Sequence, residues 1–188
     1  MNGRSQDPDK IFNEMIFSQF NRIFTISHLT GSFTLRSGQV SGEYFDKYLF
    51  ESEPALLADI ASEMSNLIPE DTEILAGLEM GGIPIATAVS LKTGIPAVFV
   101  RKKAKEYGTC KLAEGTNIDG KKLCVIEDVI TTGGQVALST NDLRVFGAVV
   151  ENVLCVIERD VKGRENLEKA GLMLHSLFTM EELKESVH

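Results

Sequence analysis

From about residue 70 to residue 180, short apolar runs alternate with polar loops and helical stretches, and this alternation constrains the fold more than any other feature. We expect strands at the apolar runs 74–78, 97–100, 123–126, 149–157 and 172–178. We expect helices between several of them, at about 83–92, 135–146 and 164–170. Alternation of this kind predicts right-handed βαβ crossovers and an α/β fold, in which helices flank a mostly parallel sheet. Ligands of such sheets bind beyond the carboxyl ends of the strands.

The first fifty residues follow a different pattern, which predicts an N-terminal appendage to this sheet. Asp7 is a suitable N-cap, Pro8 suits the first helical position, and apolar residues recur at helical spacing over 11–24. Residues 25–50 are short β-prone pieces separated by glycines, as in a small antiparallel element. A helix at about 52–67 follows. We therefore predict one domain over 1–188, with the N-terminal helix and appendage at about 1–50 and the α/β core at about 70–180.

Composition excludes several classes of protein. The chain has 188 residues, of which 43% are hydrophobic and 24% charged, as in ordinary soluble globular proteins. The net charge of −8 argues against nucleic acid or an anionic membrane as a partner. The polar N-terminus and the lack of a long apolar run lead us to expect a cytoplasmic protein. The three cysteines and three histidines are scattered along the chain, so no protein metal site is expected.

The strongest functional signal is the segment 123–135, which reads LCVIEDVITTGGQ. An apolar strand ends in two adjacent carboxylates, Glu127 and Asp128, and a small loop rich in hydroxyl groups and glycine leads into a helix. The backbone N–H groups of such a loop, its Thr hydroxyls and the helix N-terminus can together bind a phosphate. The two carboxylates would repel that phosphate unless they accept hydrogen bonds from an attached sugar. The segment fits neither a Walker loop nor the GxGxxG pattern.

This segment resembles the phosphoribosyl pyrophosphate (PRPP) signature of the type I phosphoribosyltransferases. The resemblance implies that residues 131–135 hold the 5-phosphate and that Glu127 and Asp128 hold the ribose hydroxyls, with Asp128 also taking a catalytic role. The implied PRPP-binding residues of this segment are Glu127, Asp128, Val129, Ile130, Thr131, Thr132, Gly133, Gly134 and Gln135.

A second segment, the cationic stretch that begins at residue 101, reads RKKAKEYGT and continues to Glu114-Gly115. By itself such a charge run is typical of a solvated surface loop. Beside a polyphosphate site it would instead supply cations and a lid that excludes water. It resembles the catalytic loop of the orotate phosphoribosyltransferases. The resemblance implies that Arg101, Lys102, Lys105 and Tyr107 contact PRPP, that Arg101 and Lys105 are catalytic, and that the loop completes the site of a partner subunit in a homodimer.

Three further pieces agree with this resemblance. The glycine-rich turn at 77–84 is either a plain βα turn or, as in the family, a close approach of backbone to pyrophosphate. Arg159 is either an exposed arginine or the clamp on the orotate carboxylate. In the appendage, which resembles the family's hood over the base, Arg36 lies where many relatives have lysine. Tyr44 and Phe45 either contact the base or fill the hood. The implied orotate-binding residues are Thr131, Arg159, Arg36, Tyr44 and Phe45.

The resemblance implies transfer of a phosphoribosyl group from PRPP to orotate, with Mg²⁺ bound through the substrate rather than by a protein cage. Two alternatives remain open from the sequence. A phosphoribosyltransferase for another base would keep the PRPP site and change the residues around the base. A regulator that senses PRPP without catalysis could lose the cationic loop, which this chain retains.

Overall fold

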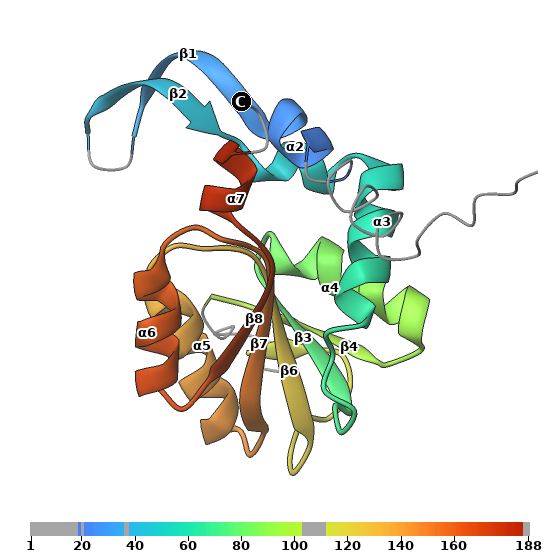
Figure 1. Cartoon of the computed structure of the whole chain (residues 1–188). Coiled ribbons are helices and arrows are strands. Elements are labelled where there is room, and N and C mark those ends of the chain that lie inside the picture. The colour runs from blue at the N-terminus through green and yellow to red at the C-terminus, as the bar shows by residue number, and fades with distance from the viewer. Residues whose placement is uncertain (1–18, 20, 36–37, 103–111, 186–188) are drawn as a thin grey trace, which may run out of the picture.

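The structure, a computed structural model, describes residues 19, 21–35, 38–102 and 112–185, with side chains described as far as residue 182. Its core is a six-stranded sheet in the order β5-β4-β3-β6-β7-β8 (Figure 1). The strands are β3 (Ile74–Leu78), β4 (Ala97–Val100), β5 (Ala113–Glu114), β6 (Lys122–Ile130), β7 (Val149–Glu158) and β8 (Met173–Thr179). Only β5 runs antiparallel to its neighbour. The predicted α/β class with a mostly parallel sheet is therefore confirmed.

Helices cover both faces of this sheet (Figure 1). They are α3 (Pro54–Ser65) and α4 (Gly82–Thr93) on one face, and α5 (Gly134–Val145) and α6 (Val161–Lys169) on the other. Two separate clusters of buried apolar side chains form the core. Leu75 of β3 packs with α3 and α4, whereas its neighbours Ile74 and Ala76 pack with α5 and α6. This division follows from the strand's two-residue side-chain period, and it explains why the strands read as continuous apolar runs.

The hood hairpin is formed by β1 (His28–Thr34) and β2 (Val40–Phe45), which pair antiparallel in a sheet of their own. Figure 1 shows this hairpin above the core, with α2 (Lys47–Glu51) beside one end of it and α7 (Met180–Glu185) beneath it. Residues 21–27 before β1 are helical, and Ile23 among them is fully buried. The start of the predicted first helix, with Asp7 and Pro8, lies outside the described residues.

The helix expected at about 52–67 is confirmed as α3, which spans Pro54–Ser65. A separate short helix, α2, precedes it and was not predicted. The chain breaks here because the Glu53 carboxylate accepts hydrogen bonds from the backbone N–H groups of Ala55 and Leu56, and a proline suits the first turn. Phe50 of α2 is fully buried in the core, so the short helix is held firmly against it. No helix in the described part of the chain is long and apolar enough to cross a membrane.

Candidate active site

Three neighbouring parallel strands, β3, β6 and β7, end at the same edge of the sheet. The turn at 79–82 follows β3, Asp128 lies near the end of β6, and Arg159 comes directly after β7. The segments that the sequence singled out therefore come together, because the carboxyl ends of parallel strands share one edge. Figure 1 shows α2 and the hood hairpin on this side of the core.

The loop between β6 and α5 presents Thr131 and Thr132 to solvent and turns sharply at Gly133. Gly133 has a φ of +70°, and a side chain there would come within 3.0 Å of the Gly163 carbonyl and of Leu167. Helix α6 thus packs directly beneath the loop, and the Asn166 amide donates to the Thr132 carbonyl at 3.0 Å. Helix α6 therefore supports the loop from the core side, and the two threonine side chains face solvent.

The turn between β3 and α4 packs on the carboxylates of β6. A Cβ atom on Gly81 would lie 1.6 Å from Asp128 Oδ2, and one on Gly82 would lie 2.2 Å from the Ile126 carbonyl. Only glycine allows this approach. The two turns that the sequence treated separately are therefore one continuous surface around Asp128.

Helices α4 and α5 both begin at this surface, and neither has a side-chain cap at its N-terminus. The N-termini of α2, α3 and α6 are different, since each is capped by the carboxylate of its own preceding residue, Asp46, Glu53 or Asp160. Uncapped backbone N–H groups and the positive end of the helix dipole favour anions. The edge of the sheet thus presents two uncapped helix N-termini that can attract anions, and the turn before one of them packs against Asp128.

Four ionisable side chains from α2 and β6 gather at the end of β6: Lys47, Glu51, Glu127 and Asp128. Asp128 has no exposed surface, and its Oδ2 lies 2.6 Å from Nζ of Lys47. Burial lowers the pKa of Lys47, but the Asp128 carboxylate outweighs that effect, so the net pKa lies above its ordinary value. Burial and the neighbouring Asp128 raise the pKa of Glu127 to about 8 and that of Glu51 to about 9. Negative charge is therefore crowded here, and Lys47 relieves it.

The cationic stretch is described only at its beginning. Nε of Arg101 lies 3.4 Å from the Glu114 carboxylate, and Lys102 is exposed. The backbone N–H of Lys102 donates to Glu79 Oε1 at 2.5 Å, which joins the base of this stretch to the turn after β3. The structure thus brings Arg101 and Lys102 to the site. Two predicted residues of this stretch, Lys105 and Tyr107, lie outside the described residues.

The predicted base-binding residues differ in their surroundings. Arg159 is exposed, and its backbone N–H donates to the Ile130 carbonyl at 2.8 Å, which places it beside Thr131. On β2, Tyr44 is 42% exposed and stacks on Phe33 with ring centroids 5.4 Å apart. Phe45 points to the other face of the strand and packs against the core cluster. Arg36 lies outside the described residues.

Sequence reasoning missed the residues that support the site from elsewhere in the chain. Lys47, Glu51 and Asn166 were not singled out. The one available signal was the spacing of Lys47 and Glu51, which places oppositely charged groups one helical turn apart. That spacing gives no indication that they face β6.

Comparisons with known proteins agree with this geometry. A sequence model of the phosphoribosyl transferase domain matches residues 50–166. The chain is 55% identical over 161 residues to the orotate phosphoribosyltransferase of Nocardioides sp. (strain ATCC BAA-499 / JS614), covering 86% of this chain and 90% of that protein. It is 45% identical over 153 residues to the orotate phosphoribosyltransferase of Methanocella arvoryzae, covering 81% and 87% of the two chains.

Solved structures show the same likeness. The orotate phosphoribosyltransferase of Mycobacterium tuberculosis in complex with Fe(III) dicitrate has a TM-score of 0.81 and 29% identity, covering 90% of this chain and 98% of that one. The same protein in complex with 5-phospho-alpha-D-ribosyl 1-diphosphate has a TM-score of 0.77 and 26% identity, covering 90% and 99%. The architecture, the glycine-lined anion sites around Asp128 and these relatives lead to one conclusion: the chain belongs to the orotate phosphoribosyltransferases, within the type I phosphoribosyltransferase family.

Proposed function

We propose that this chain transfers the phosphoribosyl group of PRPP to orotate, giving orotidine 5′-monophosphate and pyrophosphate in the synthesis of UMP, and that it does so in the cytoplasm. The observation that carries the proposal is the pair of uncapped helix N-termini, at α4 and α5, at the same edge of the sheet as the buried Asp128 carboxylate. PRPP has a phosphate at one end, a diphosphate at the other and a diol between them, and these groups suit two anion sites and the carboxylates of β6.

The two ends of PRPP differ in what they require. Residues 131–135 and the N-terminus of α5 are assigned to the 5-phosphate, because the loop presents hydroxyl and backbone N–H groups there. The turn at 79–82 and the N-terminus of α4 are assigned to the pyrophosphate. Arg101, Lys102 and Lys105 add the positive charge that a departing pyrophosphate needs, with Lys105 as the main catalytic cation.

The ribose is assigned to Glu127 and Asp128. Oε2 of Glu127 is buried and has no hydrogen-bond partner among the described residues, so it can accept from a sugar hydroxyl. These carboxylate oxygens also suit the neighbourhood of Mg²⁺, a hard cation that prefers oxygen ligands and retains part of its water shell. Bound to the ribose hydroxyls and the pyrophosphate, Mg²⁺ would neutralise the charge of the leaving group.

Orotate is assigned to the space between the loop after β6 and the hood hairpin. The Arg159 guanidinium suits the planar orotate carboxylate, which it can bind with two parallel hydrogen bonds. Thr131 lies beside it, Arg36 adds a cation from the hood, and Tyr44 offers an exposed aromatic ring. Phe45 supports the hood from its packed face. As the ring nitrogen of orotate bonds to the ribose carbon and pyrophosphate departs, the proton of that nitrogen passes to pyrophosphate or to solvent.

An acceptor screen tests the proposed reaction. Purified protein is mixed with PRPP, Mg²⁺ and orotate, and the loss of orotate absorbance is followed, with uracil, adenine and hypoxanthine as competing acceptors. We expect product from orotate alone. Transfer to another base, or binding of PRPP without transfer to any of them, would contradict the proposal and favour one of the two alternatives left open by the sequence.

A homodimer with shared sites is part of the same proposal, and mixing two inactive variants tests it. In such a dimer Lys105 of one subunit would serve the site that contains Asp128 of the other. After Lys105→Ala and Asp128→Asn proteins are mixed and exchange subunits, half the dimers are mixed, and each has one intact site. We expect recovery of about a quarter of the wild-type rate. A mixture that stays inactive while light scattering shows subunit exchange would contradict shared sites.

A further inference from the structure

The hood helix α2 supplies a cation to the ribose-binding edge of the core. Lys47 is the first residue of α2, and its Nζ lies 2.6 Å from Oδ2 of the fully buried Asp128. Two interactions, one on each side of Lys47 in the sequence, hold this helix in place. Phe50 is fully buried in the core, and the backbone N–H of Asp46 donates to the Ser27 carbonyl at 2.8 Å. These contacts fix the backbone of Lys47 beside Asp128.

The charges around Lys47 show what it opposes. On β6 it faces Glu127 and Asp128, and on its own helix it adjoins Tyr48 and Glu51. Among these residues, Glu51, Glu127 and Asp128 carry carboxyl groups, and Lys47 carries the ammonium group. A buried carboxylate without a counter-ion takes up a proton, and a protonated group is a poorer acceptor for ribose hydroxyls.

The geometry also leaves room for the substrate. The Asp128 carboxylate accepts a hydrogen bond at Oδ1 from the backbone N–H of Val129, while Oδ2 contacts Lys47. An ionised carboxylate has about four acceptor positions. Lys47 and a ribose hydroxyl can therefore bind the same carboxylate together, and the lysine need not leave when PRPP arrives.

We propose that Lys47 is a positioning residue for PRPP: its ammonium group balances the charge of the buried Asp128 carboxylate and holds that carboxylate toward the ribose, and so couples the hood to the PRPP site. This inference rests on the proposed ribose role of Asp128. Lys47 acts on the substrate through Asp128, so its removal affects PRPP far more than orotate.

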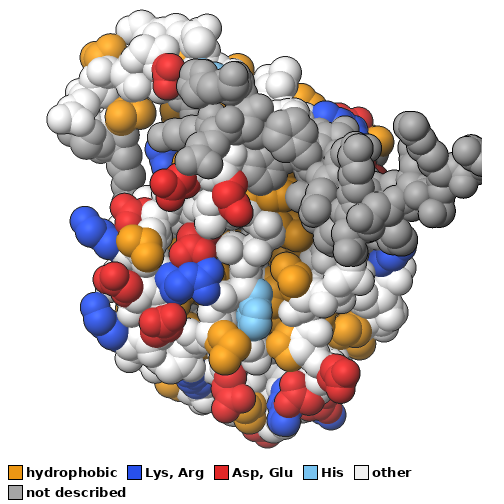
Figure 2. Space-filling view, viewed as in Figure 1, with side chains coloured by type: hydrophobic (Ala, Val, Ile, Leu, Met, Phe, Trp, Pro, Cys, Tyr) orange, Lys and Arg blue, Asp and Glu red, His pale blue; other side chains and the backbone are white. Residues whose placement is uncertain are grey.

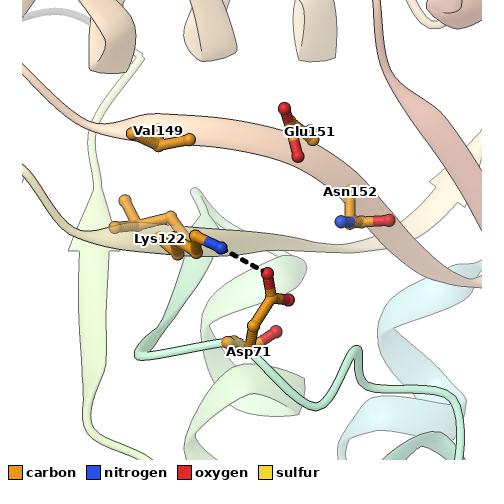
Figure 3. A pocket seen from close by; sticks show the side chains of 7 residues that line it. Asp71, Lys122, Val149, Glu151 and Asn152 are labelled. Carbon is orange, nitrogen blue, oxygen red and sulfur yellow. Dashed lines mark hydrogen bonds and ion pairs between the residues drawn. The ribbon is translucent and has the colours of Figure 1, made fainter.

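The test compares Lys47→Met and Lys47→Gln, which remove the charge, with Lys47→Arg, which keeps it. Lys122→Met is the matched control. Its Nζ lies 2.6 Å from Asp71 Oδ2, at the opposite end of β6, where both side chains are exposed (Figure 3). The assay is kcat and KM for PRPP and for orotate, with PRPP affinity measured by calorimetry.

For both uncharged variants we expect KM for PRPP to rise and PRPP affinity to fall, each at least about tenfold, with little change in KM for orotate. Lys47→Arg and Lys122→Met should follow the wild type. Unchanged PRPP affinity, or equal losses for both substrates, would overturn the inference and leave a purely structural contact. An inactive wild type would instead refute the proposed function. If Lys47→Met does not fold, Lys47→Gln decides the outcome on the same readouts, and failure of both uncharged variants to fold would also overturn the inference.

Discussion

Gly81→Ala adds one methyl group at the point where the two turns of the active site touch. The new Cβ would lie 1.6 Å from Oδ2 of Asp128 and 2.4 Å from its Cγ, far inside contact distance. Asp128 is fully buried, and the same Oδ2 contacts Lys47 at 2.6 Å. Either the carboxylate or the turn at 79–82 must therefore move, and both are assigned to PRPP.

The size of the effect follows from two separate contributions. Overpacking of a tightly packed site costs about 1–3 kcal/mol of stability, and in a protein of this size about 1 kcal/mol corresponds to roughly 2–4 °C in Tm. We therefore expect Tm to fall by about 2–12 °C. Hydrogen bonds to a charged group contribute about 1.5–3 kcal/mol, so displacement of Asp128 should weaken PRPP binding by about tenfold to a hundredfold.

Calorimetric titration with PRPP and Mg²⁺ measures the affinity, and a thermal melt measures Tm. Gly42→Ala is the matched control, because a Cβ there would meet only the Gly31 carbonyl, at 3.9 Å. We expect the control to bind PRPP as the wild type does. If Gly81→Ala bound PRPP with wild-type affinity, Asp128 and the turn after β3 would not form one ribose and pyrophosphate site, and the reasoning above would be refuted.

Three further predictions concern the same site. Lys105→Ala should lower turnover at least about a hundredfold with little change in Tm, and unchanged turnover in the absorbance assay would remove Lys105 from catalysis. Asp128→Asn should weaken PRPP binding, and normal affinity by calorimetry would contradict its ribose role. Burial raises the pKa of Glu51 to about 9, so the native state retains a proton that the unfolded chain loses from about pH 4.5 upward. Stability should therefore fall as pH rises through this window, and Glu51→Gln should raise Tm at pH 8 but not at pH 4; equal changes at both pH values would argue against a protonated Glu51.

Charged side chains on the surface away from the site differ from those around Asp128. In the view of Figure 2, acidic and basic side chains lie next to one another on the face that includes α6. The control pair Lys122–Asp71 is an exposed ion pair, and solvent screening leaves such pairs with little effect on stability. The Lys47–Asp128 pair differs because Asp128 is fully buried, so removing Lys47 leaves the Asp128 charge without compensation.

The order of the core elements could be predicted because it depends on local pattern. Apolar runs of strand length, separated by helical stretches, gave five of the sheet's strands close to their observed positions. The two-residue strand β5 and the short helix α2 were missed, since neither is long enough to produce a periodic signal. The split between α2 and α3 depends on the Glu53 cap and on Pro54, which begin α3 within two residues of the expected start.

The segment 127–135 could also be predicted from the sequence, since its carboxylates, hydroxyls and glycines are adjacent in the chain. The assignment of these residues to PRPP, and of the hood to orotate, stays a prediction until a ligand is measured. Placement within the hood was decided by strand geometry. Tyr44 and Phe45 are neighbours in sequence, but alternation along β2 leaves one exposed and packs the other.

The sequence by itself therefore determined the fold class and the anion-binding loop, because strand and helix periods and a turn's composition are properties of contiguous residues. Only the tertiary structure decided what surrounds Asp128. The parallel sheet brings the Gly81 turn against its carboxylate, and the packing of Phe50 carries Lys47 to the same oxygen. These contacts join residues that are 47 and 81 positions apart, and no local pattern in a single sequence encodes such a distance.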